Sequence, residues 1–146
     1  FNANRDVTLV EETIDLDHDV ESNKIVVEVD AVSVDAFIRT MLDIKAYHGA
    51  VSLNSPIGAV GYGTVIKAGS DVTTFKEGDI VMGMLQAATY VVVPCEGLQI
   101  KRNLPYVAPT ASLGLFGISG LTAYIGMFVS PAKGPQKGET VVVSAA

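Results

Sequence analysis

Gly58–Val65 reads GAVGYGTV and Phe75–Val81 reads FKEGDIV, and these two stretches decide the fold. Each combines apolar, β-branched residues with the glycines and aspartates that are typical of turns between short strands. Similar short apolar runs lie on both sides of them, and the expected strands are 7–10, 24–34, 64–67, 79–84, 88–94 and 97–101. Short strands at this close spacing predict a mainly β, barrel-like domain.

The pattern changes after Pro105. Between residues 107 and 129 apolar side chains recur at spacings of three and four, which predicts a helix with Ser119 as a candidate N-cap. After a loop rich in Pro, Gly and Lys comes the valine-rich run 139–146. Such a run after a helix is typical of a buried parallel strand, which needs neighbouring strands. We therefore expect two domains, 1–108 and 109–146, the second being the start of a larger one.

Composition restricts the class of function. The 146 residues are 49% hydrophobic and 18% charged, as in globular proteins. A formal net charge of -6 disfavours nucleic acid and anionic membrane surfaces as partners, because both reward basic patches. No apolar run reaches the roughly 18 residues of a membrane span, and the first residues do not resemble a signal peptide. Cys95 is the only cysteine, so no intrachain disulfide can form, and we expect a soluble, cytoplasmic protein.

Three segments, in register, resemble one family. SVDAFIR at 33–39 resembles a motif of the prostaglandin reductases, alkenal double-bond reductases and curcumin reductases. The glycine-rich stretch 58–81 resembles the strand pair of their GroES-like domain. GLTAY at 120–124 and KGETVVVSAA at 137–146 resemble the entry into their nucleotide-binding domain. The chain is thus similar, over nearly its whole length, to the N-terminal part of zinc-independent medium-chain dehydrogenases/reductases.

The resemblance implies a GroES-like, partly open β-barrel, then a linking helix and the first strand of a truncated Rossmann domain. It implies NADPH-dependent reduction of the activated C=C bond of enals and enones by hydride transfer, with NADPH bound mainly beyond Ala146. The chain alone is then expected to be inactive. A homodimer is compatible with the resemblance for the longer protein. A zinc-free quinone reductase remains an alternative, as does a non-catalytic structural or binding relative.

The glycines at 58, 61 and 63 resemble a dinucleotide fingerprint in their spacing. That fingerprint follows a strand and opens a helix, because the phosphate lies at the helix N-terminus. Here the glycines lead into Thr64–Ile66, which predicts a strand. Close packing between strands is therefore the preferred interpretation.

A catalytic zinc is not expected. Such a site needs three ligands from Cys, His, Asp or Glu. Where zinc-using relatives carry Cys, His and Glu, this chain has Val32, Ala59 and Val60. The two histidines, His18 and His48, are interpreted as solvated or hydrogen-bonded within the protein, so no metal is predicted.

The resemblance also nominates site residues. Tyr47 matches a tyrosine facing substrate, and its hydroxyl could stabilise an enolate or relay a proton; otherwise it is an ordinary surface tyrosine. Phe37 and Arg39 would line the substrate pocket, and Asp35 the nicotinamide pocket, unless Asp35 and Arg39 form a local salt bridge. Thr122 would approach the nicotinamide carboxamide or be a residue of the first helical turn. Five further apolar residues are expected either to form an adaptable wall of the site or to pack in the core: Met41, Leu42, Met82, Met84 and Leu85.

Overall fold

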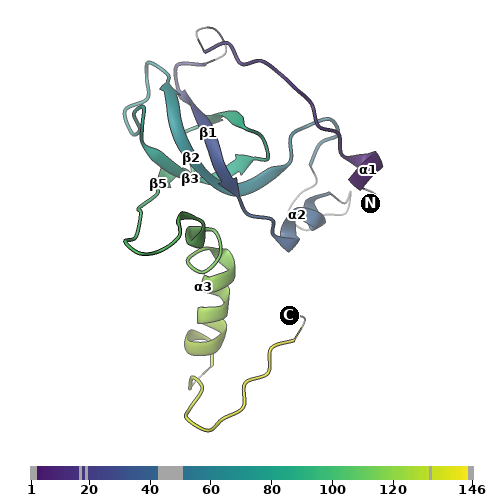
Figure 1. Cartoon of the computed structure of the whole chain (residues 1–146), viewed down its shortest axis with the longest axis vertical. Coiled ribbons are helices and arrows are strands. Elements are labelled where there is room, and N and C mark those ends of the chain that lie inside the picture. The colour runs from purple at the N-terminus through teal and green to yellow at the C-terminus, as the bar shows by residue number, and fades with distance from the viewer. Residues whose placement is uncertain (1–2, 17, 19, 43–50, 132, 145–146) are drawn as a thin grey trace. The chain divides into compact units, whose positions relative to one another are not determined.

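The computed structural model describes residues 3–16, 18, 20–42, 51–131 and 133–144 (Figure 1). Its contacts divide the chain into two compact units, Phe1–Asn103 and Leu104–Ala146. The domain boundary expected at residue 108 remains a prediction. In the described part of the chain, no helix is long and apolar enough to cross a membrane.

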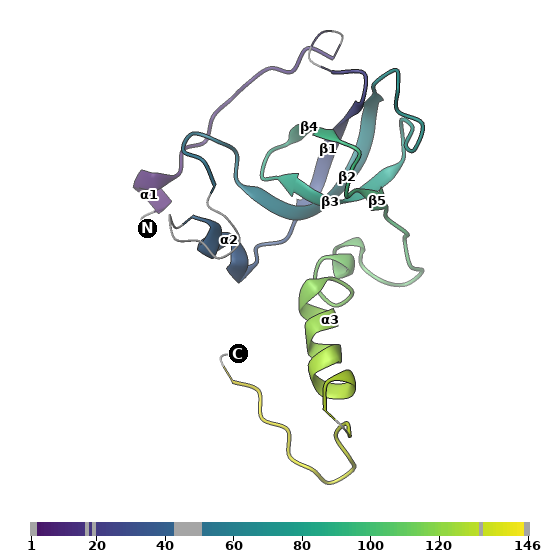
Figure 2. The same cartoon turned by 180° about the vertical axis from the view of Figure 1, so that it is seen from behind.

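The first unit is built on one antiparallel sheet in the order β4-β1-β2-β3-β5. Its strands are β1 (Lys24–Val32), β2 (Gly58–Ala68), β3 (Ile80–Gln86), β4 (Tyr90–Pro94) and β5 (Gln99–Ile100). The sheet is curved (Figure 1, Figure 2), but its edge strands β4 and β5 are not paired with each other within the described residues. The expected mainly β, partly open barrel is therefore confirmed.

The core lies on one face of this sheet. The register pairs Ala59 with Leu85 and Gly63 with Val81, which puts the odd-numbered residues of β2 and β3 on the core face. Fully burying one Val, Leu or Ile side chain stabilises the fold by about 1.5–3 kcal/mol. The buried cluster consists of Ile25, Val27, Val65, Val81, Leu85, Val91 and Val93.

Two glycines of β2 allow β1 to pass unusually close. A Cβ on Gly63 would collide with the carbonyl oxygen of Glu28 and would lie 2.7 Å from Cγ1 of Val27. A Cβ on Gly61 would lie 2.7 Å from the carbonyl oxygen of Ala31. The β1–β2 ladder is irregular here, with a register shift between Val29 and Ala31. The glycines thus serve strand packing, as expected.

An exposed polar pair bridges β1 and β4. Glu28 and Tyr90 are directly opposite in the register, and the Tyr90 hydroxyl donates to Oε1 of Glu28 (3.1 Å). This hydrogen bond and the charge of the carboxylate raise the pKa of Tyr90 above its ordinary value of 10.0. The phenol therefore stays protonated and keeps the cross-strand contact into alkaline solution.

The second unit contains a short helical rod. Its elements are η1 (Pro109–Ser112), α3 (Ile118–Tyr124) and η2 (Ile125–Val129), the last having π-helical geometry. The rings of Tyr124 and Phe128 pack at a centroid distance of 5.4 Å along this rod. The helix expected between 107 and 129 is therefore present in part: α3 and η2 are continuous, whereas turn residues 113–117 separate η1 from them.

Two expectations about the first unit were wrong in detail. Residues 7–10 form no strand, and Leu9 is 92% exposed. Both edges of β1 are already occupied, by β2 and β4, so this segment finds no free edge there. β2 begins at Gly58 and not at residue 64, because its glycines belong to the ladder. Two short helices, α1 (Ala3–Asp6) and α2 (Ala36–Met41), complete the unit.

Two expectations about the second unit also fail. The N-cap of α3 is Gly117, and Ser119 lies inside the helix. The valine run is not a strand in this chain, and Val142 is 83% exposed. A parallel strand needs hydrogen-bonding neighbours and covered faces, and the described residues of this unit offer it neither.

Gly63→Ala tests the close approach of β1 and β2. The added methyl meets backbone, which cannot rotate away, so we expect about 3 kcal/mol of destabilisation in urea unfolding followed by circular dichroism. Gly114→Ala is the control, because a Cβ there meets no atom within 4 Å. Equal stability of the two variants would contradict the proposed role of Gly63.

Candidate active site

α2 is held at the end of the sheet where β1 finishes and β2 starts (Figure 1). The Ser33 N–H donates to the carbonyl oxygen of Val60 (2.7 Å) just before the chain turns into the helix. At the other end, the Val51 N–H donates to the carbonyl oxygen of Met41 (2.9 Å). These two bonds fix a six-residue helix that would be marginal in isolation.

Three predicted site residues lie together on this short segment. Asp35 is the N-cap residue, with φ -99° and ψ 151°, yet its carboxylate makes no capping hydrogen bond to the helix. Phe37 is half-buried, whereas Arg39 is exposed. Asp35 is half-buried, and the roles of all three residues remain predictions.

The other two predicted residues are not among the described residues of the first unit. Tyr47 lies outside the described residues, as does His48. Thr122 belongs to the second unit, where it is exposed on α3 and donates its hydroxyl proton to the carbonyl oxygen of Ile118 (2.7 Å). Its oxygen retains lone pairs, so towards a ligand it could act only as an acceptor.

The three positions at which the resemblance would place zinc ligands hold hydrocarbon side chains. Val32 lies opposite Gly61 in the ladder, with its Cγ1 3.0 Å from where a glycine Cβ would be. Ala59 is buried in the core. No group of three His, Cys, Asp or Glu side chains suited to a metal occurs among the residues that the structure describes.

The face of β2 and β3 opposite the core is also apolar. Its residues pair across the two strands as Val60 with Met84 and Tyr62 with Met82. We call these four residues the outer face. Its two ends differ, because Tyr62 is only 6% exposed whereas Met84 is 53% exposed.

A buried lysine covers the Tyr62 end, and sequence analysis missed it. Lys101 is 7% exposed, its Nζ lies 4.5 Å from the centroid of the Tyr62 ring, and it donates to Oδ1 of Asn103 (2.7 Å). The backbone N–H of Lys101 also donates to the carbonyl oxygen of Ile80 (2.8 Å). A cation over an aromatic face is stabilised by the ring quadrupole, which offsets part of its desolvation. Nothing in the local sequence signals that this lysine is buried.

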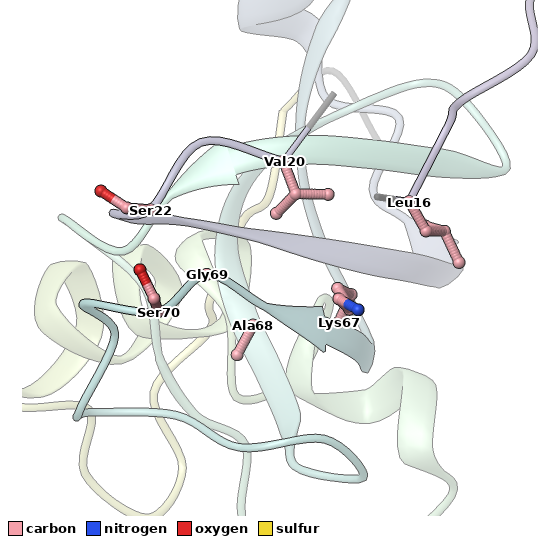
Figure 3. Close-up of a pocket in the computed structure, with 7 residues that line it drawn as sticks. All are labelled: Leu16, Val20, Ser22, Lys67, Ala68, Gly69 and Ser70. Carbon is pink, nitrogen blue, oxygen red and sulfur yellow. The ribbon is translucent and has the colours of Figure 1, made fainter. Parts of the chain in front are cut away.

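The structure also has an open hollow of about 240 Å³ away from α2 (Figure 3). Ser22 and Ser70 lie at one end of it, and Leu16 and Lys67 at the other. The two serine hydroxyls donate to the carboxylate of Asp71 and so brace the turn around it. The hollow is therefore part of a structural turn and contains none of the predicted site residues.

Comparison with known proteins accounts for this arrangement. Residues 2–100 match the family described as the N-terminal domain of oxidoreductase. The chain belongs to this family. With it, the expected membership of the medium-chain dehydrogenase/reductase superfamily is confirmed.

Two curated relatives are similar in sequence. The chain is 35% identical to YfmJ of Bacillus subtilis, which is named as an NADP-dependent oxidoreductase. The match covers 86% of this chain and 36% of that protein. It is 32% identical to the NADP-dependent 2-alkenal reductase of Nicotiana tabacum, over 97% of this chain and 40% of that protein. The chain therefore spans well under half the length of both.

A solved structure supports the fold of this family member. CurA from Vibrio vulnificus, crystallised with NADPH, superimposes with a TM-score of 0.67 at 20% identity. The match covers 82% of this chain and 34% of CurA. At this identity the likeness concerns the fold alone.

Tyr62→Leu tests the lysine contact. Loss of the ring face removes the cation–π interaction, and we expect about 2 kcal/mol of destabilisation in chemical unfolding. Tyr62→Phe keeps the ring and should stay within about 0.5 kcal/mol of wild type, since a phenyl face also attracts cations. If Lys101→Met abolishes the difference between the two variants, the loss is due to this contact; a difference that persists would assign it to packing.

Proposed function

We propose that this chain is the substrate-binding part of an NADPH-dependent reductase of activated C=C bonds in enals and enones. The observation that carries the proposal is the family match over residues 2–100, together with α2 held at one end of the sheet. Two relatives above 30% identity are named for NADP-dependent chemistry, and one is a 2-alkenal reductase.

The reaction demands little acid–base chemistry from the protein. When bound, NADPH supplies a hydride to the β-carbon of the substrate. The C=C electron pair then moves towards the carbonyl group, so negative charge develops on its oxygen, and a proton is added at the α-carbon. The protein must orient the carbonyl, place a donor beside its oxygen and exclude water.

The described residues fit a role at the nicotinamide end of the cofactor and not at its phosphates. The space beside Gly61 and Gly63 is filled by the backbone of β1, so these two glycines cannot cradle a phosphate. Asp35 would accept from the carboxamide, since its carboxylate is not used to cap α2. Thr122 is assigned to the cofactor on the family resemblance alone.

Tyr47 is assigned to the substrate oxygen on the family resemblance. Its phenol would donate to the developing enolate and relay the proton. Phe37, half-buried on α2, would provide an apolar wall, and the exposed Arg39 would lie at the entrance. No metal is assigned, because Val32, Ala59 and Val60 offer no ligand atoms.

The proposal is tested by following NADPH consumption with the full-length gene product. We expect turnover of trans-2-octenal to exceed that of a simple benzoquinone. Turnover confined to the quinone would favour a quinone reductase. No turnover with either would favour a non-catalytic relative, provided that the protein is folded.

Tyr47→Phe is expected to lower kcat and kcat/KM for the enal together by about 10²–10³-fold, because its hydrogen bond matters mainly in the transition state. A surface tyrosine would leave both constants near wild type.

The companion change Phe37→Tyr restores the phenol usual in the family at α2. If Phe37 lines the site, it should alter KM or substrate preference while thermal unfolding stays unchanged.

A further inference from the structure

The outer face of β2 and β3 is closed at one end and open at the other. At Tyr62 the ring is covered by Lys101, which Asn103 and the backbone of Ile80 hold in place. Met82, opposite Tyr62, is half-buried. Any small molecule that meets this face must therefore do so at its other end.

That other end is formed by Met84 and Val60. Their register places them where β1 finishes, because the Val60 carbonyl oxygen accepts from Ser33, two residues before Asp35. Antiparallel pairing brings the end of β1, the start of β2 and the end of β3 to the same end of the sheet. Met84 and α2 are thus at one end of the first unit.

The Met84 side chain extends towards this end and away from Tyr62. Its Sδ lies 3.8 Å from where a Cβ of Gly58 would be, so the thioether passes over the first residue of β2. Gly58 directly follows the segment that joins α2 to β2. Met84 is 53% exposed, so its side chain is accessible to a small molecule.

We infer that Met84 determines the chain-length preference of the enzyme by contacting the aliphatic tail of the substrate. The inference rests on the proposed function and names the apolar part of its substrate. Methionine is unbranched and polarisable, so it adapts to tails of different length. Its neighbour Leu85, on the opposite face, is fully buried in the core and has no access to a ligand.

The test compares kcat/KM for trans-2-octenal and for acrolein in the full-length gene product. Met84→Ala should lower the octenal-to-acrolein ratio about 10-fold, because the longer tail loses its apolar contact while acrolein has none to lose. Met84→Leu should keep the ratio within about 3-fold, since volume-conserving apolar changes are tolerated. Ile100→Ala is the control, because Ile100 is 49% exposed on β5 of the same sheet.

The octenal-to-acrolein ratios of the variants distinguish a role of Met84 from a general effect on the enzyme. A lower ratio in Met84→Ala alone, with thermal unfolding unchanged, supports the inference. Normal enal turnover with an unchanged ratio overturns the role of Met84 and leaves the proposed function intact. An equal fall in Ile100→Ala also overturns it, because the effect would then not be local. If the wild type reduces no enal, the proposed function fails, and the inference fails with it.

Discussion

The backbones of β1 and β2 pass each other with no room for a side chain between them. At Gly63 a methyl group would meet the carbonyl oxygen of Glu28, and at Gly61 it would meet that of Ala31. This contact sets the register in which Val27 faces Val65 in the core. It also fixes where β1 ends and hence where α2 begins. The candidate site thus depends on two missing Cβ atoms.

Local signals predicted the elements that are stabilised locally. Glycines and aspartates around short apolar runs predicted the strands that form the sheet. Residues 7–10 and the valine run have the same strand-like composition, but pairing is a property of the sheet and not of the segment. Residues 7–10 cannot pair with β1, because β2 and β4 already occupy both of its edges.

The candidate site was predicted in part. Asp35, Phe37 and Arg39 were expected together and lie on one turn of α2 and its N-cap. Lys101 could not be foreseen, because a lysine is rarely buried and its partner Tyr62 is distant in the sequence. The sequence alone also could not show which of the methionine and leucine candidates face the core. The register of β2 and β3 shows that Leu85 lies in the core and Met84 on the outer face.

The strand order has a consequence for biosynthesis. β1 is translated before β4, and its outer edge is completed only when Lys24 pairs with Pro94. At about 5–20 residues per second, the ribosome needs several seconds to make the chain between them. During that interval an apolar strand with an open edge is available to wrong partners. Chaperone access to the nascent chain should therefore matter during this interval.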